Sequence, residues 1–205
     1  MLFFCCKPLA LRLGPTATIA LAILCGSSAS SALAQKVTNA AQVTVKPTVS
    51  RDDKGFSLCG VRVALSVGEG KANKTYDFLV TAHADNATAM IKAGSYSHLK
   101  TGVAEIEPAP VGFSILEMPT MIVATATKIV PADIPGFSVG ESGLLSTMIV
   151  MHALADGKPM KFSIRLPKQK VDTAVSFQKS MTKPDLAAYD ACAEGLHDRI
   201  TRNQR

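Results

Sequence analysis

Apolar and polar residues alternate over long stretches of this chain, and this pattern constrains the fold more than any other sequence feature. Apolar side chains recur at alternate positions from 56 to 67 and from Met160 to Leu166. The alternation resumes after a polar turn and continues to Phe177. A period of two places successive side chains on opposite faces of a β-strand, so residues 160–177 are predicted to form a β-hairpin.

Further strands are predicted where β-branched and aromatic residues are bounded by turn residues. Residues 42–49 are predicted to form an edge strand, because Pro47 cannot donate a hydrogen bond to a neighbouring strand. The other predicted strands cover residues 75–81, 111–118 and 121–130. About seven strands that do not alternate regularly with helices indicate an α+β protein with a mostly antiparallel sheet.

A short helix is predicted over residues 87–92. Asp85 and Asn86 precede this segment as candidate N-caps, and Gly94 follows it as a candidate C-terminal stop. The residues from Gly94 to Pro110 are then predicted to form a loop.

A buried helix is predicted near residues 142–155, which are strongly apolar. The length of the segment favours a helix, and Ser138 and Glu141 have the spacing of a capping pair at its start. Gly157 is the candidate stop. A buried strand is the alternative, because apolar density alone does not distinguish the two.

An amphipathic helix is predicted near residues 184–201, at the C-terminal end of the chain. Pro184 is compatible with the first helical turn, and Asp185 and Arg199 are placed to complement the helix dipole at the two ends. The residues predicted to face the core are Leu186, Tyr189, Ala193, Leu196 and Ile200.

Residues 1–34 have the features of a secretory signal peptide. Lys7 and Arg12 precede an apolar core at residues 18–25, and small residues follow it. The apolar core is about half the ~20 residues that span a bilayer, so a membrane anchor is the weaker interpretation. We therefore expect a periplasmic or secreted protein in which residues 35–205 form one compact β-rich domain.

Two cysteines, Cys59 and Cys192, remain after the predicted signal peptide. An even pair in an exported protein is most simply a disulfide, and neither cysteine belongs to a C-x-x-C motif. Lipidation of Cys25 is a weaker alternative to signal-peptide cleavage, because the bulky Leu24 precedes it.

The sequence lacks the motifs of common catalytic sites. Ser142 does not fit the G-x-S-x-G motif, because Leu144 stands where the second glycine belongs. The His83-Ala-Asp85 spacing is an isolated pair with no supporting motif. We therefore expect a protein that is not an enzyme and has no cofactor. A hydrolase is the weaker alternative, with a site drawn from His83, Asp85, His98 and His152.

Met148, Met151 and His152 form a candidate metal site. Thioether and imidazole ligands suit Cu(I), so copper is the alternative cofactor that the sequence allows. Core packing explains the same residues without a metal, because methionine commonly fills irregular cores.

Basic residues cluster near the predicted C-terminal hairpin, while the whole chain carries a net charge of only +6. The chain has no dense basic stripe with interleaved aromatic residues, so we expect no nucleic-acid partner. Contact with an anionic surface is predicted for Lys161, Arg165, Lys168 and Lys170, with a solvated face as the alternative. The functional expectation is an exported, non-catalytic module that binds a protein or envelope component.

Overall fold

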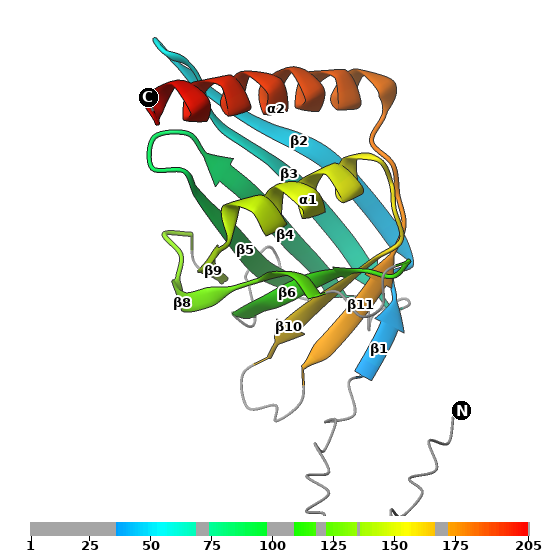
Figure 1. Ribbon diagram of the computed structural model, residues 1–205. Coiled ribbons are helices and arrows are strands. Elements are labelled where there is room, and N and C mark those ends of the chain that lie inside the picture. Colours follow the sequence, from blue (N-terminus) through cyan, green and yellow to red (C-terminus); the bar gives the residue numbers. More distant parts are fainter. Residues whose placement is uncertain are drawn as a thin grey trace, which may run out of the picture. The chain divides into compact units, whose positions relative to one another are not determined.

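The computed structural model describes residues 36–68, 74–97, 109–117, 122–134, 136–166 and 172–204. These residues form eleven strands in two sheets and two helices (Figure 1). Only the β1–β11 pair among the described strands is parallel, so the predicted α+β class with a mostly antiparallel sheet is confirmed. The predicted signal peptide lies outside the described residues.

The larger sheet has six strands in the order β2-β3-β4-β5-β9-β8. Pro47 lies in β2, which is an edge strand as predicted. The turn between β2 and β3 ends at Gly55, whose φ of +105° favours glycine. In sheet order the strands are β2 (Gln42–Asp52), β3 (Gly55–Val67), β4 (Lys74–His83), β5 (Thr88–Ser97), β9 (Phe137–Ser142) and β8 (Thr127–Pro131).

The smaller sheet has five strands in the order β1-β11-β10-β6-β7. The predicted hairpin is confirmed as the antiparallel pair β10–β11. The single strand predicted over 121–130 is wrong, because the chain passes from the smaller to the larger sheet at Ala126 and forms two strands. In sheet order the strands are β1 (Lys36–Asn39), β11 (Thr173–Phe177), β10 (Met160–Arg165), β6 (Ala109–Ile115) and β7 (Ile122–Thr125).

The core lies on one face of the larger sheet. The smaller sheet covers one part of this face, and the helices α1 (Leu144–Ala155) and α2 (Lys183–Asn203) cover another (Figure 1). Three buried aromatic rings join the two sheets: the Phe162 centroid lies 3.6 Å from that of Phe78 and 4.4 Å from that of Phe113. Aromatic side chains bury large apolar areas, so this cluster fixes the two sheets against each other.

The helix predicted over residues 87–92 is wrong, because the segment belongs to strand β5. Ala89, Ile91 and Ala93 are all buried at alternate positions, and β5 pairs with β4 on one side and β9 on the other. The predicted caps form the β4–β5 turn instead. Pairing with two neighbours therefore outweighs the local capping pattern, and β5 extends to Ser97 into the predicted loop.

The buried helix is confirmed as α1, but its predicted capping pair is wrong. Ser138 and Glu141 lie in strand β9, and the residue before the helix is Gly143, which offers no side-chain cap. The helix starts later than the pattern predicts because β9 pairs with β5 through Ser142. Gly157 has a φ of +71°, which confirms it as the stop after α1.

Helix α2 is confirmed, and its N-terminus is capped. The backbone N–H of Asp185 donates to Oγ1 of Thr182 at 3.4 Å, and Pro184 lies in the first turn. The predicted apolar set faces the core, with Leu186 less deeply buried than the other four residues.

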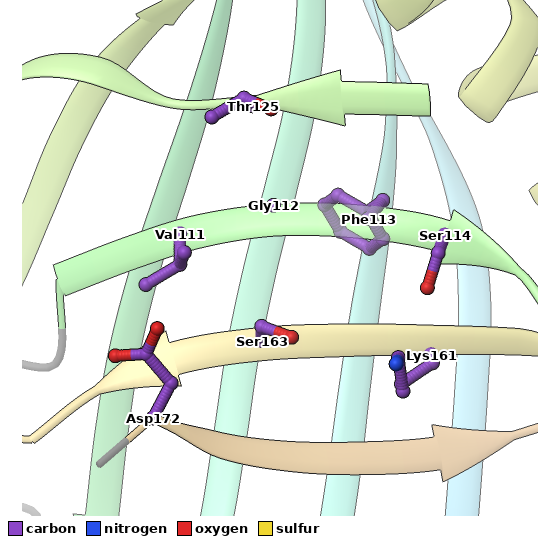
Figure 2. A pocket seen from close by; sticks show the side chains of 8 residues that line it. All are labelled: Val111, Gly112, Phe113, Ser114, Thr125, Lys161, Ser163 and Asp172. Carbon is purple, nitrogen blue, oxygen red and sulfur yellow. The ribbon is translucent and has the colours of Figure 1, made fainter. Parts of the chain in front are cut away.

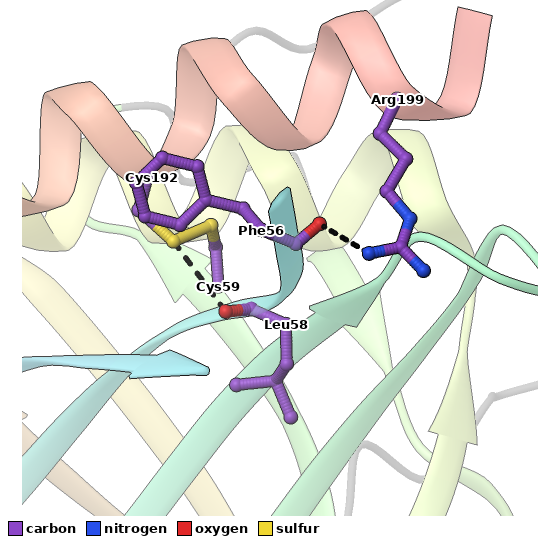
Figure 3. Close-up of a disulfide and its surroundings, with 5 residues drawn as sticks. All are labelled: Phe56, Leu58, Cys59, Cys192 and Arg199. Atoms are coloured by element: carbon purple, nitrogen blue, oxygen red, sulfur yellow. Dashed lines mark hydrogen bonds between the residues drawn. A yellow bond between two sulfur atoms is a disulfide. The ribbon is translucent and has the colours of Figure 1, made fainter. Parts of the chain in front are cut away.

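Cys59 of β3 and Cys192 of α2 lie at disulfide-bonding distance, as predicted, with a Cα–Cα distance of 5.8 Å (Figure 3). Gly195, one turn further along α2, lies against the ring of Phe56. A Cβ at Gly195 would lie 2.4 Å from Cδ2 of Phe56, so the close approach of helix and strand requires glycine here.

Arg199 does more than complement the helix dipole, because its side chain is only 4% exposed. It donates from Nη1 to Oδ1 of Asp52 at 2.6 Å. The same Nη1 also donates to the carbonyl oxygen of Phe56 at 3.3 Å (Figure 3). Its Nη2 donates to Asp85 in the β4–β5 turn. One buried guanidinium therefore ties the C-terminal part of α2 to two turns of the larger sheet.

We expect the double variant Cys59→Ala/Cys192→Ala to lose much of its stability. The cysteines are 133 residues apart, for which the chain-entropy model gives an upper value of about 4–5 kcal/mol. Urea denaturation followed by circular dichroism measures the difference from the oxidised wild type. Reductant should destabilise the wild type and leave the double variant unchanged. Equal unfolding midpoints for oxidised wild type and double variant would contradict the predicted role of this link.

Candidate functional site

The two helices border an open groove of about 450 Å³. Helix α1 contributes Met148 and His152, which are one turn apart on the same helix face. The residues that α2 contributes are Asp190, Ala193, Glu194 and His197. A third element could therefore pack against both helices at this groove.

The helix α1 is mostly apolar, but it is not fully buried. The side facing the sheets includes Val150 and Leu154, whose side chains are almost completely inaccessible to solvent. Leu145, in contrast, is 75% exposed, and Ile149, one turn further on, is 39% exposed. A helix that is hydrophobic all round is normally buried, so this exposed face of α1 departs from the usual pattern.

The α2 side of the groove is acidic. Asp190 and Glu194 are exposed and lie one turn apart on the helix. The ring of His152, which lines the groove, packs nearly perpendicular to the buried ring of Tyr189, with centroids 5.4 Å apart. Burial raises the pKa of Tyr189, and the nearby carboxylates of Asp190 and Asp156 raise it further. The groove thus combines Met148 and His152 of α1 with negative charge on α2, and the exposed Leu145 and Ile149 lie on the same helix as Met148.

The structure does not bring the three predicted metal ligands to one surface. Met148 and His152 line the groove, whereas Met151 is 1% exposed and belongs to the core. In the part of the chain that the structure describes, no three His, Cys, Asp or Glu side chains gather as a metal-binding group. The copper hypothesis therefore stays a prediction.

The sequence analysis missed the contribution of α2 to this groove. Asp190, Glu194 and His197 recur at helical spacing on the face of α2 that adjoins the apolar stripe. This spacing was visible in the sequence, but its position opposite α1 depends on tertiary packing.

The other catalytic candidates do not form a site among the described residues. Asp85 is ion-paired with Arg199. Burial lowers the pKa of His83, although the charge of Asp85 opposes this shift. His98 lies outside the described residues. The buried Oγ of Ser142 has no hydrogen-bond partner in the described part of the structure, so no base is positioned there to activate it.

A second hollow, of about 180 Å³, lies on the smaller sheet (Figure 2). Lys161 lines it, and Arg165 stands beside it as the ion-pair partner of Asp172, with Nε donating to Oδ1 at 2.9 Å. Lys168 and Lys170 lie outside the described residues. Of the predicted basic surface, Lys161 and Arg165 therefore lie among the described residues, and the charge of Arg165 is neutralised by Asp172.

Comparisons with protein-family models, with curated proteins and with solved structures found no match to this chain. Neither of the two helices in the described segments combines the length and apolar character that crossing a membrane requires.

Acid should weaken the attachment of α2 through Asp52. The hydrogen bond that Asp52 accepts from Arg199 is the main cause of the lowered pKa of the Asp52 carboxyl. This pKa lies below the ordinary value of 3.8. A carboxyl group whose pKa is lowered by folding stabilises the folded state above its unfolded pKa. This contribution is lost as the pH falls through the folded pKa.

We therefore expect Asp52→Asn to be less stable than the wild type at neutral pH, with the difference shrinking as the pH falls below 3.8. Urea denaturation at a series of pH values measures it. Asp53→Asn, in the same turn and exposed, is the matched control and should change stability little. A difference that is constant with pH, or an equal loss for Asp53→Asn, would contradict the ion-pair role.

Proposed function

We propose that this protein is an exported, non-catalytic binding module that receives a cationic amphipathic segment of a protein partner in the groove between α1 and α2. The apolar face of that segment covers α1, and its basic residues meet the carboxylates of α2. The site of action is the periplasm or the extracellular space.

The exposed apolar face of α1 carries this proposal. Leu145 and Ile149 lie one turn apart on the mostly apolar helix α1, and both are exposed. Exposed apolar side chains that adjoin a groove are a common feature of surfaces that bind partners. Covering Leu145 and Ile149 removes apolar surface from water, at roughly 25 cal/mol for each Å².

The charge of the groove selects the class of partner. Asp190 and Glu194 place two carboxylates in the groove that Met148 of α1 also lines, and an acidic or uncharged segment would leave these carboxylates without partners. A helix with Lys or Arg along one side and Leu-like residues along the other satisfies both walls. Complementary charge of this kind improves specificity and association rate more than it improves affinity.

Export is supported by the leader pattern of residues 1–34 and by the cysteine pair. Disulfides form and persist in oxidising compartments, and the paired cysteines anchor the helix that forms one wall of the groove. The proposed binding groove therefore depends on a disulfide that forms in an oxidising compartment, and the leader would direct the chain to such a compartment.

A synthetic 18-residue helical peptide of Leu and Lys tests the proposal directly. We expect the mature wild-type protein to bind it with micromolar affinity, and Leu145→Ser/Ile149→Ser to bind about tenfold more weakly, because apolar contact area is lost. Fluorescence anisotropy of the labelled peptide measures both. Val130→Ser is the matched control, since Val130 is 53% exposed on β8, the edge strand at the opposite side of the larger sheet from β2.

A second experiment tests the role of charge with the same peptide in which Glu replaces Lys. We expect this acidic peptide to bind much more weakly to the wild type and to gain affinity for Asp190→Lys/Glu194→Lys. No binding of the basic peptide, equal affinity of the Leu145/Ile149 variant and the wild type, or no preference between the two peptides would each refute the proposal.

Metal handling is the second candidate, favoured by the presence of Met148 and His152 in one groove with His197 opposite them. Anaerobic titration with Cu(I) distinguishes it from peptide binding. If copper is the ligand, we expect a dissociation constant below about 1 µM that is lost in Met148→Leu/His152→Gln. Met151→Leu, a core substitution, should leave binding unchanged. Binding weaker than about 1 µM would remove this candidate.

A further inference from the structure

The two methionines of α1 differ sharply in their access to solvent. Met148 is half-buried and lines the open groove between α1 and α2. Met151, three residues further along the same helix, is 1% exposed and belongs to the core. The buried Met160 and Met181 are also core residues. A small solute that enters the groove therefore reaches the side chain of Met148 but not that of Met151.

The other sulfur atoms among the described residues lie outside the groove. Cys59 and Cys192 are fully buried and paired with each other, so neither offers a free thiol. Met90 of strand β5 is half-buried, and it lies on the face of the larger sheet opposite the core because its neighbours Ala89 and Ile91 are buried on the core side. Met90 therefore resembles Met148 in exposure without sharing its position in the groove.

A methionine thioether that is open to solvent reacts with hydroperoxides. Hydrogen peroxide transfers one oxygen atom to the sulfur. The S–O bond of a sulfoxide forms while the O–O bond breaks, and the second oxygen leaves with both hydrogens as water. The sulfur loses two electrons and the peroxide gains them. The product is polar and chiral, whereas the thioether was apolar.

The charge of the groove favours an uncharged oxidant. Asp190 and Glu194 line the same groove as Met148, and their negative charges repel anionic oxidants. Hydrogen peroxide and small organic hydroperoxides are neutral at physiological pH, so the two carboxylates do not exclude them. The chemical class of oxidant that fits this groove is therefore a neutral hydroperoxide.

A sulfoxide at position 148 would change the surface that receives a ligand. Met148 lies one helical turn from the exposed Leu145 on one side and from His152 on the other. A sulfoxide oxygen is a hydrogen-bond acceptor, and covering it with an apolar side chain leaves that acceptor without a partner. Oxidation therefore removes apolar contact from the groove and favours water there.

We propose that Met148 is a reversible oxidation site, at which a neutral hydroperoxide forms the sulfoxide and thereby releases the segment bound in the groove. This inference rests on the peptide-binding function proposed above and adds a means of regulation to it. Methionine sulfoxide reductases of the two stereospecific classes return the sulfoxide to the thioether, which makes the change reversible.

The first test identifies the oxidised residue without any peptide. The mature, disulfide-bonded protein is treated with limiting hydrogen peroxide, digested and analysed by mass spectrometry. We expect Met148 to be oxidised about tenfold faster than Met151, because exposure governs the reaction. Equal rates at Met148 and Met151 would overturn the proposal. Thermal denaturation checks that the oxidised protein stays folded, and unfolding on oxidation would also overturn release by a local change of polarity.

The second test measures release with the basic Leu/Lys peptide described above. We expect the oxidised wild type to bind this peptide about tenfold more weakly than the untreated protein, and treatment with both reductases to restore the affinity. In Met148→Leu the affinity should be the same before and after peroxide. Met90→Leu is the matched control and should keep the full sensitivity of the wild type to peroxide.

The results distinguish failure of this inference from failure of the proposed function. Untreated wild type that does not bind the peptide refutes the proposed function and the release step together. Equal affinities of untreated and oxidised wild type refute the release step alone. Peroxide sensitivity that persists in Met148→Leu, or disappears in Met90→Leu, assigns the effect to another methionine and overturns the proposal. This comparison includes Met118 and Met121, which lie outside the described residues.

Discussion

The attachment of α2 to the larger sheet is the constraint on which the proposed peptide site depends. The helix is held at two points, by the Cys59–Cys192 link near its middle and by Arg199 near its end. Gly195 lies between these points and lets the helix approach Phe56 closely. Together these contacts set the position of α2 beside α1, and the groove exists only because both helices are held on the same face of the sheet.

The groove between α1 and α2 and the hollow on the smaller sheet differ in character because one is bordered by helices and the other lies on strands. The groove adjoins an apolar helix, so its affinity for a partner would come mainly from burial of surface, with charge deciding which partner binds. The hollow on the smaller sheet lies on a polar strand face, where alternation places Lys161 and Ser163 outward.

The sequence correctly predicted those elements in which buried residues recur with a single regular spacing. Strand β10 and helix α2 were predicted for this reason, with a period of two in the first and a helical stripe in the second. Segment 87–92 was wrongly predicted because its cap-like start is a local signal, whereas β5 is stabilised by two neighbouring strands. The partners of Arg199 lie more than a hundred residues away, so local patterns could not identify them.

The central claim is that a partner covers the exposed face of α1 in the cell, and site-specific photo-crosslinking tests it most directly. A photoreactive amino acid at position 149 should give a discrete cross-linked product with a second polypeptide. The same amino acid at position 46, on the edge strand β2, should give none. A product at 46 but not at 149, or no product at 149 in cells that export the protein, would contradict the account.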